Sequence, residues 1–219
     1  MDTTNNPIII DAGRTRAVPA LLSQVLLISS LGFAVSAVGV WLAPAFYFPG
    51  LFWVCVIASF GLIFAVRATR QNPPLSLVLF LTLTLVMGFE IAPWIQHLLH
   101  TGQTSVVFNA AVTTAVGMAV LGLGAQLFRF DYRRAASYAF AALIGLVIVG
   151  VISMFFHWIS PTAYAYLTLL IFSVLIVVDF MRIRNGGDGA TAVELALSIY
   201  LDGLNVFLAL TRIFSGSRD

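Results

Sequence analysis

The chain has 219 residues, of which 60% are hydrophobic and only 9% are charged, and its formal net charge is +2. Soluble domains carry about 25% charged residues. This composition therefore excludes a water-soluble protein, and it indicates an outer surface that mostly faces lipid. We expect the lipid bilayer as partner and no nucleic acid. The single cysteine, Cys55, excludes an intrachain disulfide.

Seven apolar stretches follow one another along the chain. They cover residues 20–42, 51–66, 75–99, 105–128, 135–156, 161–181 and 191–214. A bilayer core needs about 20 apolar residues per helix, and continuous apolar runs favour helices over a barrel. We therefore predict an all-α membrane protein, a seven-transmembrane-helix bundle. Residues 17–215 form one membrane domain, between a short disordered cytoplasmic tail (1–16) and a C-terminal tail (216–219).

The basic residues predict the orientation of the bundle. All of them are arginines, and nine lie before the first span or in alternate connections: Arg14, Arg16, Arg67, Arg70, Arg129, Arg133, Arg134, Arg182 and Arg184. The positive-inside rule then places the N-terminus in the cytoplasm, and seven spans place the C-terminus outside. A re-entrant last segment would return the C-terminus to the cytoplasm, but its length favours a full span.

Four acidic residues lie inside predicted spans, namely Glu90, Asp179, Glu194 and Asp202. Each costs about 2.5–3.5 kcal/mol on insertion scales, so such residues point to function. Asp202 lies roughly 16 Å into the last span at 1.5 Å per residue, near the bilayer centre. We favour a functional role for it. Glu194 lies close to a helix end, where a structural role is equally acceptable.

The last span carries a polar stripe. Within roughly 80° of arc it places Glu194, Ser198, Asp202, Asn205 and Arg212. Such a stripe cannot face lipid, so we expect the last helix to be enclosed by the other six. The stripe then lines a cavity or faces a partner helix. For Ser198 and Asn205, hydrogen bonding across helices is an equally simple role.

Asp179 and Asp202 lie on helices that a short turn joins, so we expect antiparallel neighbours with both aspartates in the cytoplasmic half. Two nearby carboxylates in a low dielectric tend to share a proton, which makes the pair a candidate pH sensor. Arg67 lies at a similar depth and could latch onto Asp179. The alternative for Arg67 is a solvated topology signal.

Glu90 is followed by Pro93, which frees a backbone carbonyl one turn earlier. A broken helix beside a carboxylate suits a cation pathway. His97 and His100 are three residues apart, but no third ligand is in view. We therefore expect no metal site and no cofactor.

The last segment, residues 192–214, resembles the terminal signature of the Bax inhibitor-1 family, with the core LSIYLD at 197–202 followed by Asn205, Phe207 and Leu208. Residues 171–179 look like the family's penultimate helix, which also ends on an aspartate. Residues 87–93 are similar to its third helix, and residues 129–131 to its basic connection after the fourth.

This resemblance implies a bacterial inner-membrane protein with the C-terminal helix central. Family members act as pH-sensitive calcium leaks and are linked to suppression of cell death. The resemblance matches Asp179 and Asp202 to the family's di-aspartyl pH sensor and Arg67 to its latching arginine. It also implies that calcium is the permeant ion and that protons gate it. One departure concerns the second helix. A bacterial member carries an acidic residue there about three turns before the arginine, where this chain has the apolar residues 55–58.

We therefore expect a proton-gated calcium leak and not an enzyme, with Glu90, Glu194, Ser198 and Asn205 lining its pore or cavity. A non-conducting regulator that binds other membrane proteins is the main alternative. An intramembrane aspartyl protease is a minor one, because such enzymes carry Gly-x-Gly-Asp where this chain has residues 199–202. A retinal protein is excluded, since its Schiff base needs a lysine and the chain has none.

Overall fold

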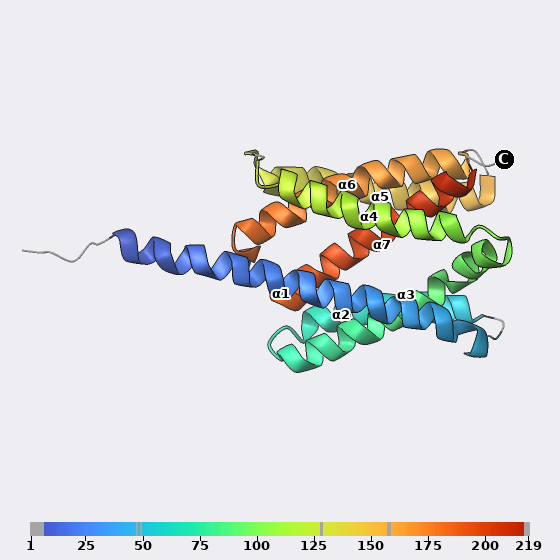
Figure 1. The fold of residues 1–219 in the computed structure, drawn as a ribbon, viewed down its shortest axis with the longest axis horizontal. Helices are drawn as coiled ribbons and strands as arrows, with labels where there is room; N and C mark the ends of the chain where they lie inside the picture. Colours follow the sequence, from blue (N-terminus) through green and yellow to red (C-terminus); the bar gives the residue numbers. More distant parts are fainter. Residues whose placement is uncertain (1–6, 47, 49, 128, 157–158, 217–219) are drawn as a thin grey trace, which may run out of the picture.

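The computed structural model describes residues 7–46, 48, 50–127, 129–156 and 159–216, and within these ranges every regular element is helical. The helices are α1 (Pro7–Leu42), α2 (Leu51–Ala68), α3 (Pro73–His100), α4 (Thr104–Gly124), α5 (Tyr132–Phe156), α6 (Pro161–Arg184) and α7 (Ala192–Gly216), with short 3₁₀ helices η1 (Ala43–Phe46) and η2 (Gly187–Gly189). Among the described residues, seven helices are long and apolar enough to cross a membrane. The predicted fold class is confirmed (Figure 1).

The first helix is longer than we expected. It begins at Pro7, so residues 7–16, which we predicted as a disordered tail, are helical. Proline suits a first helical position because its missing N–H is not needed there, and extending a helix costs far less than nucleating one. Residues 1–6 and 217–219 of the two predicted tails lie outside the described residues.

Two helices begin where a polar cap precedes a proline. The Ser160 hydroxyl accepts a hydrogen bond from the Ala163 amide at 3.2 Å, just before Pro161. The side chain of Asn72 caps α3 in the same way. Such caps satisfy amides that the start of a helix leaves without partners. The Asn72-Pro and Ser160-Pro sequences therefore define where α3 and α6 begin.

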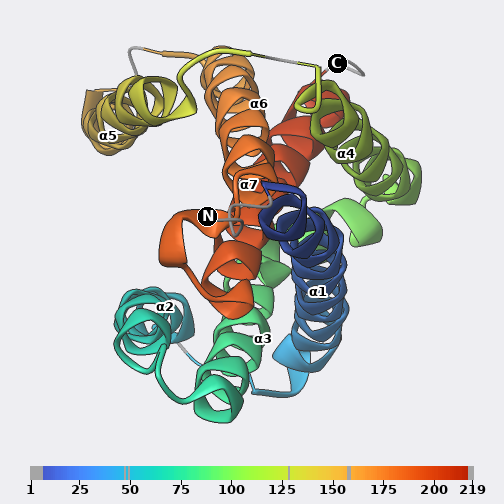
Figure 2. The ribbon, with the colours of Figure 1, turned by 90° about the vertical axis from the view of Figure 1, so that its left-hand side faces the viewer.

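α7 is the axis of the bundle. Of its most apolar 18-residue window 67% is buried, against 11–44% for the other six helices. Figure 2 shows α7 surrounded by its neighbours, with α2 and α5 at the outside. Its side chains belong to both hydrophobic clusters: one face packs with α2 and α3, the other packs with α4 and α6, and α1 contributes to both. α5 joins the second cluster by packing on α6. The prediction that the C-terminal helix is central is confirmed.

Candidate functional site

The two aspartates lie on neighbouring helices. Asp179 is near the end of α6, and Asp202 is ten residues into α7. α6 and α7 pack against each other, joined by a tight turn in which Gly186 and Asp188 adopt positive φ angles of 88° and 52°. Left-handed backbone is easy for glycine and tolerated by aspartate. This turn reverses the chain, and it brings the aspartates to the same region of the bundle.

The carboxyl groups of Asp179 and Asp202 are within hydrogen-bonding reach of each other. Asp202 is only 6% exposed, and its Oδ2 atom receives no hydrogen bond from the described residues. Two carboxylates have no proton to donate, so a hydrogen bond between them requires that one is protonated. The geometry therefore brings together a buried pair that can hold one proton between two helices.

Two arginines act electrostatically on Asp179, the α6 member of the pair. Arg67 is exposed at the end of α2, and it forms no ion pair with Asp179 among the described residues. It still acts electrostatically on Asp179, but less strongly than Arg182 does. Arg182 lies one turn after Asp179 on α6, and sequence reasoning used it only to orient the bundle. The spacing of three residues on a helix would have identified it.

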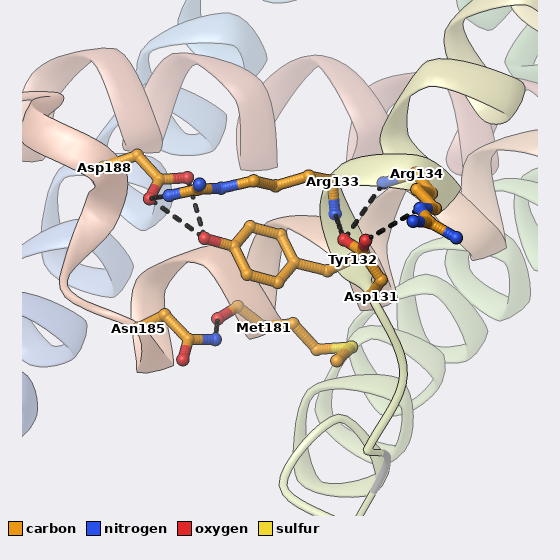
Figure 3. A network of polar contacts seen from close by, with 7 residues as sticks. All are labelled: Asp131, Tyr132, Arg133, Arg134, Met181, Asn185 and Asp188. Carbon is orange, nitrogen blue, oxygen red and sulfur yellow. Dashed lines mark hydrogen bonds and ion pairs between the residues drawn. The ribbon is translucent and has the colours of Figure 1, made fainter.

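A polar network holds the α6–α7 turn against the start of α5 (Figure 3). The Tyr132 hydroxyl donates to both carboxylate oxygens of Asp188, at 2.8 and 2.9 Å. Arg133 forms an ion pair with the same carboxylate at 2.8 Å. The Asn185 side chain donates to the Met181 carbonyl at 2.6 Å and closes the end of α6. The turn that connects the two aspartate helices is therefore anchored to a third helix.

Asp188 is in the connection between α6 and α7, outside the membrane-spanning helices, and it is exposed. The hydrogen bonds from Arg133 and Tyr132 stabilise its charged form and lower the pKa of this carboxyl below its ordinary value of 3.8. The anchor consequently persists at neutral pH. Sequence reasoning missed this network, because the partners lie 55 and 56 residues apart in the chain and no local pattern joins them.

Three predicted lining residues of α7 take different positions. Glu194 forms a capping box at the start of α7: its carboxylate accepts from the Thr191 amide at 2.8 Å, and Thr191 Oγ accepts from the Glu194 amide at 3.2 Å. Ser198 is half-buried one turn before Asp202. Asn205, one turn after, is also half-buried and donates to the Leu201 carbonyl at 2.8 Å. The fifth residue of the stripe, Arg212, is exposed.

Glu90 lies elsewhere in the bundle, at the interface of α2 and α3. The Ser59 hydroxyl of α2 donates a hydrogen bond to its Oε1 atom. Ser59 is buried and Glu90 half-buried. Within the described part of the chain, no cation pairs with Glu90. The structure therefore does not bring Glu90 together with the aspartate pair.

A group of hydrogen bonds joins α1, α3 and α7 close to Asp202 in the chain. The Tyr200 hydroxyl of α7 is 2.6 Å from the Ser36 hydroxyl of α1, and Ser36 also lies 2.7 Å from the Thr84 carbonyl of α3. Tyr200 is fully buried, and its ring packs on Phe33 and Phe80 with centroids 5.0 and 5.8 Å apart. These contacts tie α1, α3 and α7 together just before Asp202.

The described residues contain no group of three or more His, Cys, Asp or Glu side chains that could hold a metal ion. What the site offers chemically is proton binding. It has a carboxyl pair at the α6–α7 contact, arginines close enough to act on that pair, and a separate carboxyl between α2 and α3.

Known proteins are similar to this chain over most of its length. The sequence model of the family described as "Inhibitor of apoptosis-promoting Bax1" matches residues 18–219. An uncharacterized membrane protein of Streptococcus pyogenes serotype M1 is 34% identical over 179 residues, covering 76% of this chain and 75% of the relative. An uncharacterized protein of Campylobacter jejuni is 28% identical and covers 87% and 84%. The chain belongs to the Bax inhibitor-1 family.

Proposed function

We propose that this protein is a pH-sensitive calcium leak, gated by the Asp179–Asp202 pair and by the arginines that act on it. The observation that carries this proposal is the contact of two carboxyl groups from adjacent helices, one of them 6% exposed. Ionisable groups inside a membrane bundle are costly and mark ion or proton pathways. Family membership agrees with an ion-handling membrane protein.

Gating follows from the charge of the pair. At higher pH the pair carries negative charge, which attracts Arg67 of α2 and Arg182 of α6 and holds this end of the bundle shut. Protonation removes that charge and weakens the attraction between Asp179 of α6 and Arg67 of α2, so α6 becomes free to move relative to α2. Arg67 acts on Asp179 without a direct ion pair. The proposed latch is therefore a longer-range electrostatic attraction, which is weaker than an ion pair and easier to break.

Ser198 and Asn205 flank Asp202 on α7, and we assign them to the lining of the conducting path. Glu194 has its carboxylate engaged in the capping box, so its contribution is to fix the start of the helix. Calcium is the transported ion and protons are the signal. The protein works without a cofactor, and it is not an enzyme.

We place the protein in the inner membrane of a bacterium. Nine of its eleven arginines lie in the N-terminal stretch or near the α2–α3, α4–α5 and α6–α7 connections, which are at the left end in Figure 1, whereas Arg212 lies near the opposite end of the bundle. The positive-inside rule assigns the left end, with the N-terminus, to the cytoplasm. The C-terminus then lies outside, and the aspartate pair senses cytoplasmic pH.

Calcium flux into liposomes tests this proposal. The purified protein should pass calcium, with more flux at lower pH, and Asp202→Asn or Asp179→Asn should flatten the pH profile. Asp131→Asn is the matched control, because Asp131 is an exposed aspartate of the α4–α5 connection. Arg67→Gln should raise flux at high pH by weakening the latch.

Two results would contradict the leak. If both aspartate variants kept the wild-type pH profile, the pair would not be the sensor. If the folded wild type passed no calcium at any pH but was purified together with stable membrane partners, a non-conducting regulator would explain the fold better.

A further inference from the structure

A second acidic position lies apart from the aspartate pair. Glu90 is ten residues from the end of α3 at His100, or about 15 Å at 1.5 Å per residue. It therefore lies near the middle of a bilayer core of about 30 Å. The proposed leak does not use this residue as a sensor, yet a carboxyl at such depth is a functional position by default.

The surroundings of Glu90 select its ligand. Ser59 donates to its Oε1 atom from α2. The titratable groups close enough to feel the charge of Glu90 are Cys55 of α2 and Tyr200 of α7, both ordinarily neutral at pH 7. No arginine or histidine pairs with Glu90 among the described residues. Calcium takes six to eight oxygen ligands, far more than one carboxyl and one hydroxyl provide, whereas a proton needs only the carboxyl.

A cavity begins beside the α1–α2 connection, at the end of the bundle opposite the α6–α7 turn, and its lining reaches the neighbours of Glu90 on α3. It measures about 370 Å³, and among its lining residues are Gln96 and His100 near the end of α3, and Phe89 and Pro93 beside Glu90. Pro93 has no N–H, so the Phe89 carbonyl lacks its usual helical partner and is free to bind water. Polar groups therefore occur along the cavity from the membrane surface to within one turn of Glu90.

On the α2 side, the same cavity is lined by Leu51 and Phe52. Cys55 and Ser59 follow at helical spacing along this face, and both are buried. Ser59 lies seven residues beyond Phe52, which is about two helical turns, so a proton in the cavity has this buried stretch of α2 to pass before it reaches the Glu90 carboxylate.

We propose that Glu90 and Ser59 form a second proton-binding site, reached through this cavity from the end of the bundle opposite the α6–α7 turn. Binding adds one proton from water to the Glu90 carboxylate and neutralises the charge between α2 and α3. Ser59 stabilises the ionised state by donating to it. The bundle would thus respond to protons from both of its ends, through two separate sites.

Infrared spectroscopy of the protein in liposomes tests this site, because a protonated carboxyl group has its own carbonyl stretching band. A band that titrates between about pH 4 and pH 9, the range documented for glutamates from solvated to buried, should disappear in Glu90→Gln. It should remain in Asp202→Asn and in the exposed control Asp131→Asn. In Ser59→Ala the band should appear at a higher pH than in the wild type, since the lost donor had stabilised the carboxylate.

Access is measured by transfer into heavy water, in which the Glu90 band should shift within the mixing time. A folded Glu90→Gln protein whose titrating bands equal those of the wild type would overturn the site. A Glu90 band that stays unexchanged for hours would overturn the route. Neither result depends on calcium flux, so a failure here leaves the leak standing, and a protein without flux can still show this site.

Discussion

α1 and α3 approach each other most closely at two glycines. A Cβ atom built on Gly39 would lie 2.5 Å from the Leu85 carbonyl oxygen and 3.0 Å from the Gly88 Cα atom, and one built on Gly88 would collide with the Ser36 carbonyl oxygen. These neighbours are backbone atoms, which cannot rotate away as a side-chain end can. Gly88→Ala therefore forces the two helices apart.

Overpacking of a well-packed interface costs about 1–3 kcal/mol, and we expect a loss of this size for Gly88→Ala. The displaced Ser36 carries the hydroxyl bound to Tyr200, so the shift also reaches α7. The assay is reversible unfolding in mixed micelles, followed by circular dichroism. Gly117→Ala is the matched control, because a Cβ at Gly117 has no neighbour within 4 Å and alanine favours helix by about 1 kcal/mol over glycine.

The double variant Gly39→Ala/Gly88→Ala sharpens this test. Once one alanine has separated the helices, the second meets less resistance, so the combined loss should fall short of the sum of the two single losses. If Gly88→Ala were as stable as Gly117→Ala, the close packing of α1 on α3 would be refuted.

Three further substitutions test individual contacts. Tyr200→Phe removes the hydroxyl bound to Ser36 but keeps the ring packing, and should cost about 0.5–1.5 kcal/mol in the same unfolding assay. Thr191→Ala removes the Oγ atom that accepts from the Glu194 amide, one of the two bonds of the capping box, and should cost about 0.5–2 kcal/mol, with faster amide exchange confined to the first turn of α7. Asp188→Asn should speed amide exchange in the α6–α7 turn at neutral pH. Because the pKa of Asp188 is lowered, the wild-type protection is present above its ordinary value of 3.8. Protection should fall to that of the variant only as the pH drops below that value, and equal protection at pH 7 would contradict the anchor.

The sequence predicted the seven helices and the central position of α7 because both follow from local patterns. Long apolar runs define membrane spans, and the polar stripe through Asp202 cannot face lipid. The proximity of Asp179 and Asp202 was also predictable, since only a short turn separates α6 from α7. The extension of α1 back to Pro7 was not predicted, because a polar and charged stretch resembles a tail unless its helix continues from a stable neighbour.

Other parts of the site follow different rules. The capping box of Thr191 and Glu194 has a local signature, Thr-x-x-Glu, and could have been recognised in the sequence. The bond between Ser59 and Glu90 depends on how α2 rotates against α3, and the contact of Tyr132 with Asp188 depends on where α5 meets the α6–α7 turn. Periodicity fixes neither arrangement, so these contacts required the three-dimensional structure.

The most direct test of the central claim is calcium entry into liposomes at two pH values, with wild type and the Asp179→Asn/Asp202→Asn double variant compared at equal protein density. If the aspartate pair is the gate, lowering the pH increases flux through the wild type and leaves flux through the double variant unchanged. An equal increase in both proteins would contradict gating by the aspartate pair.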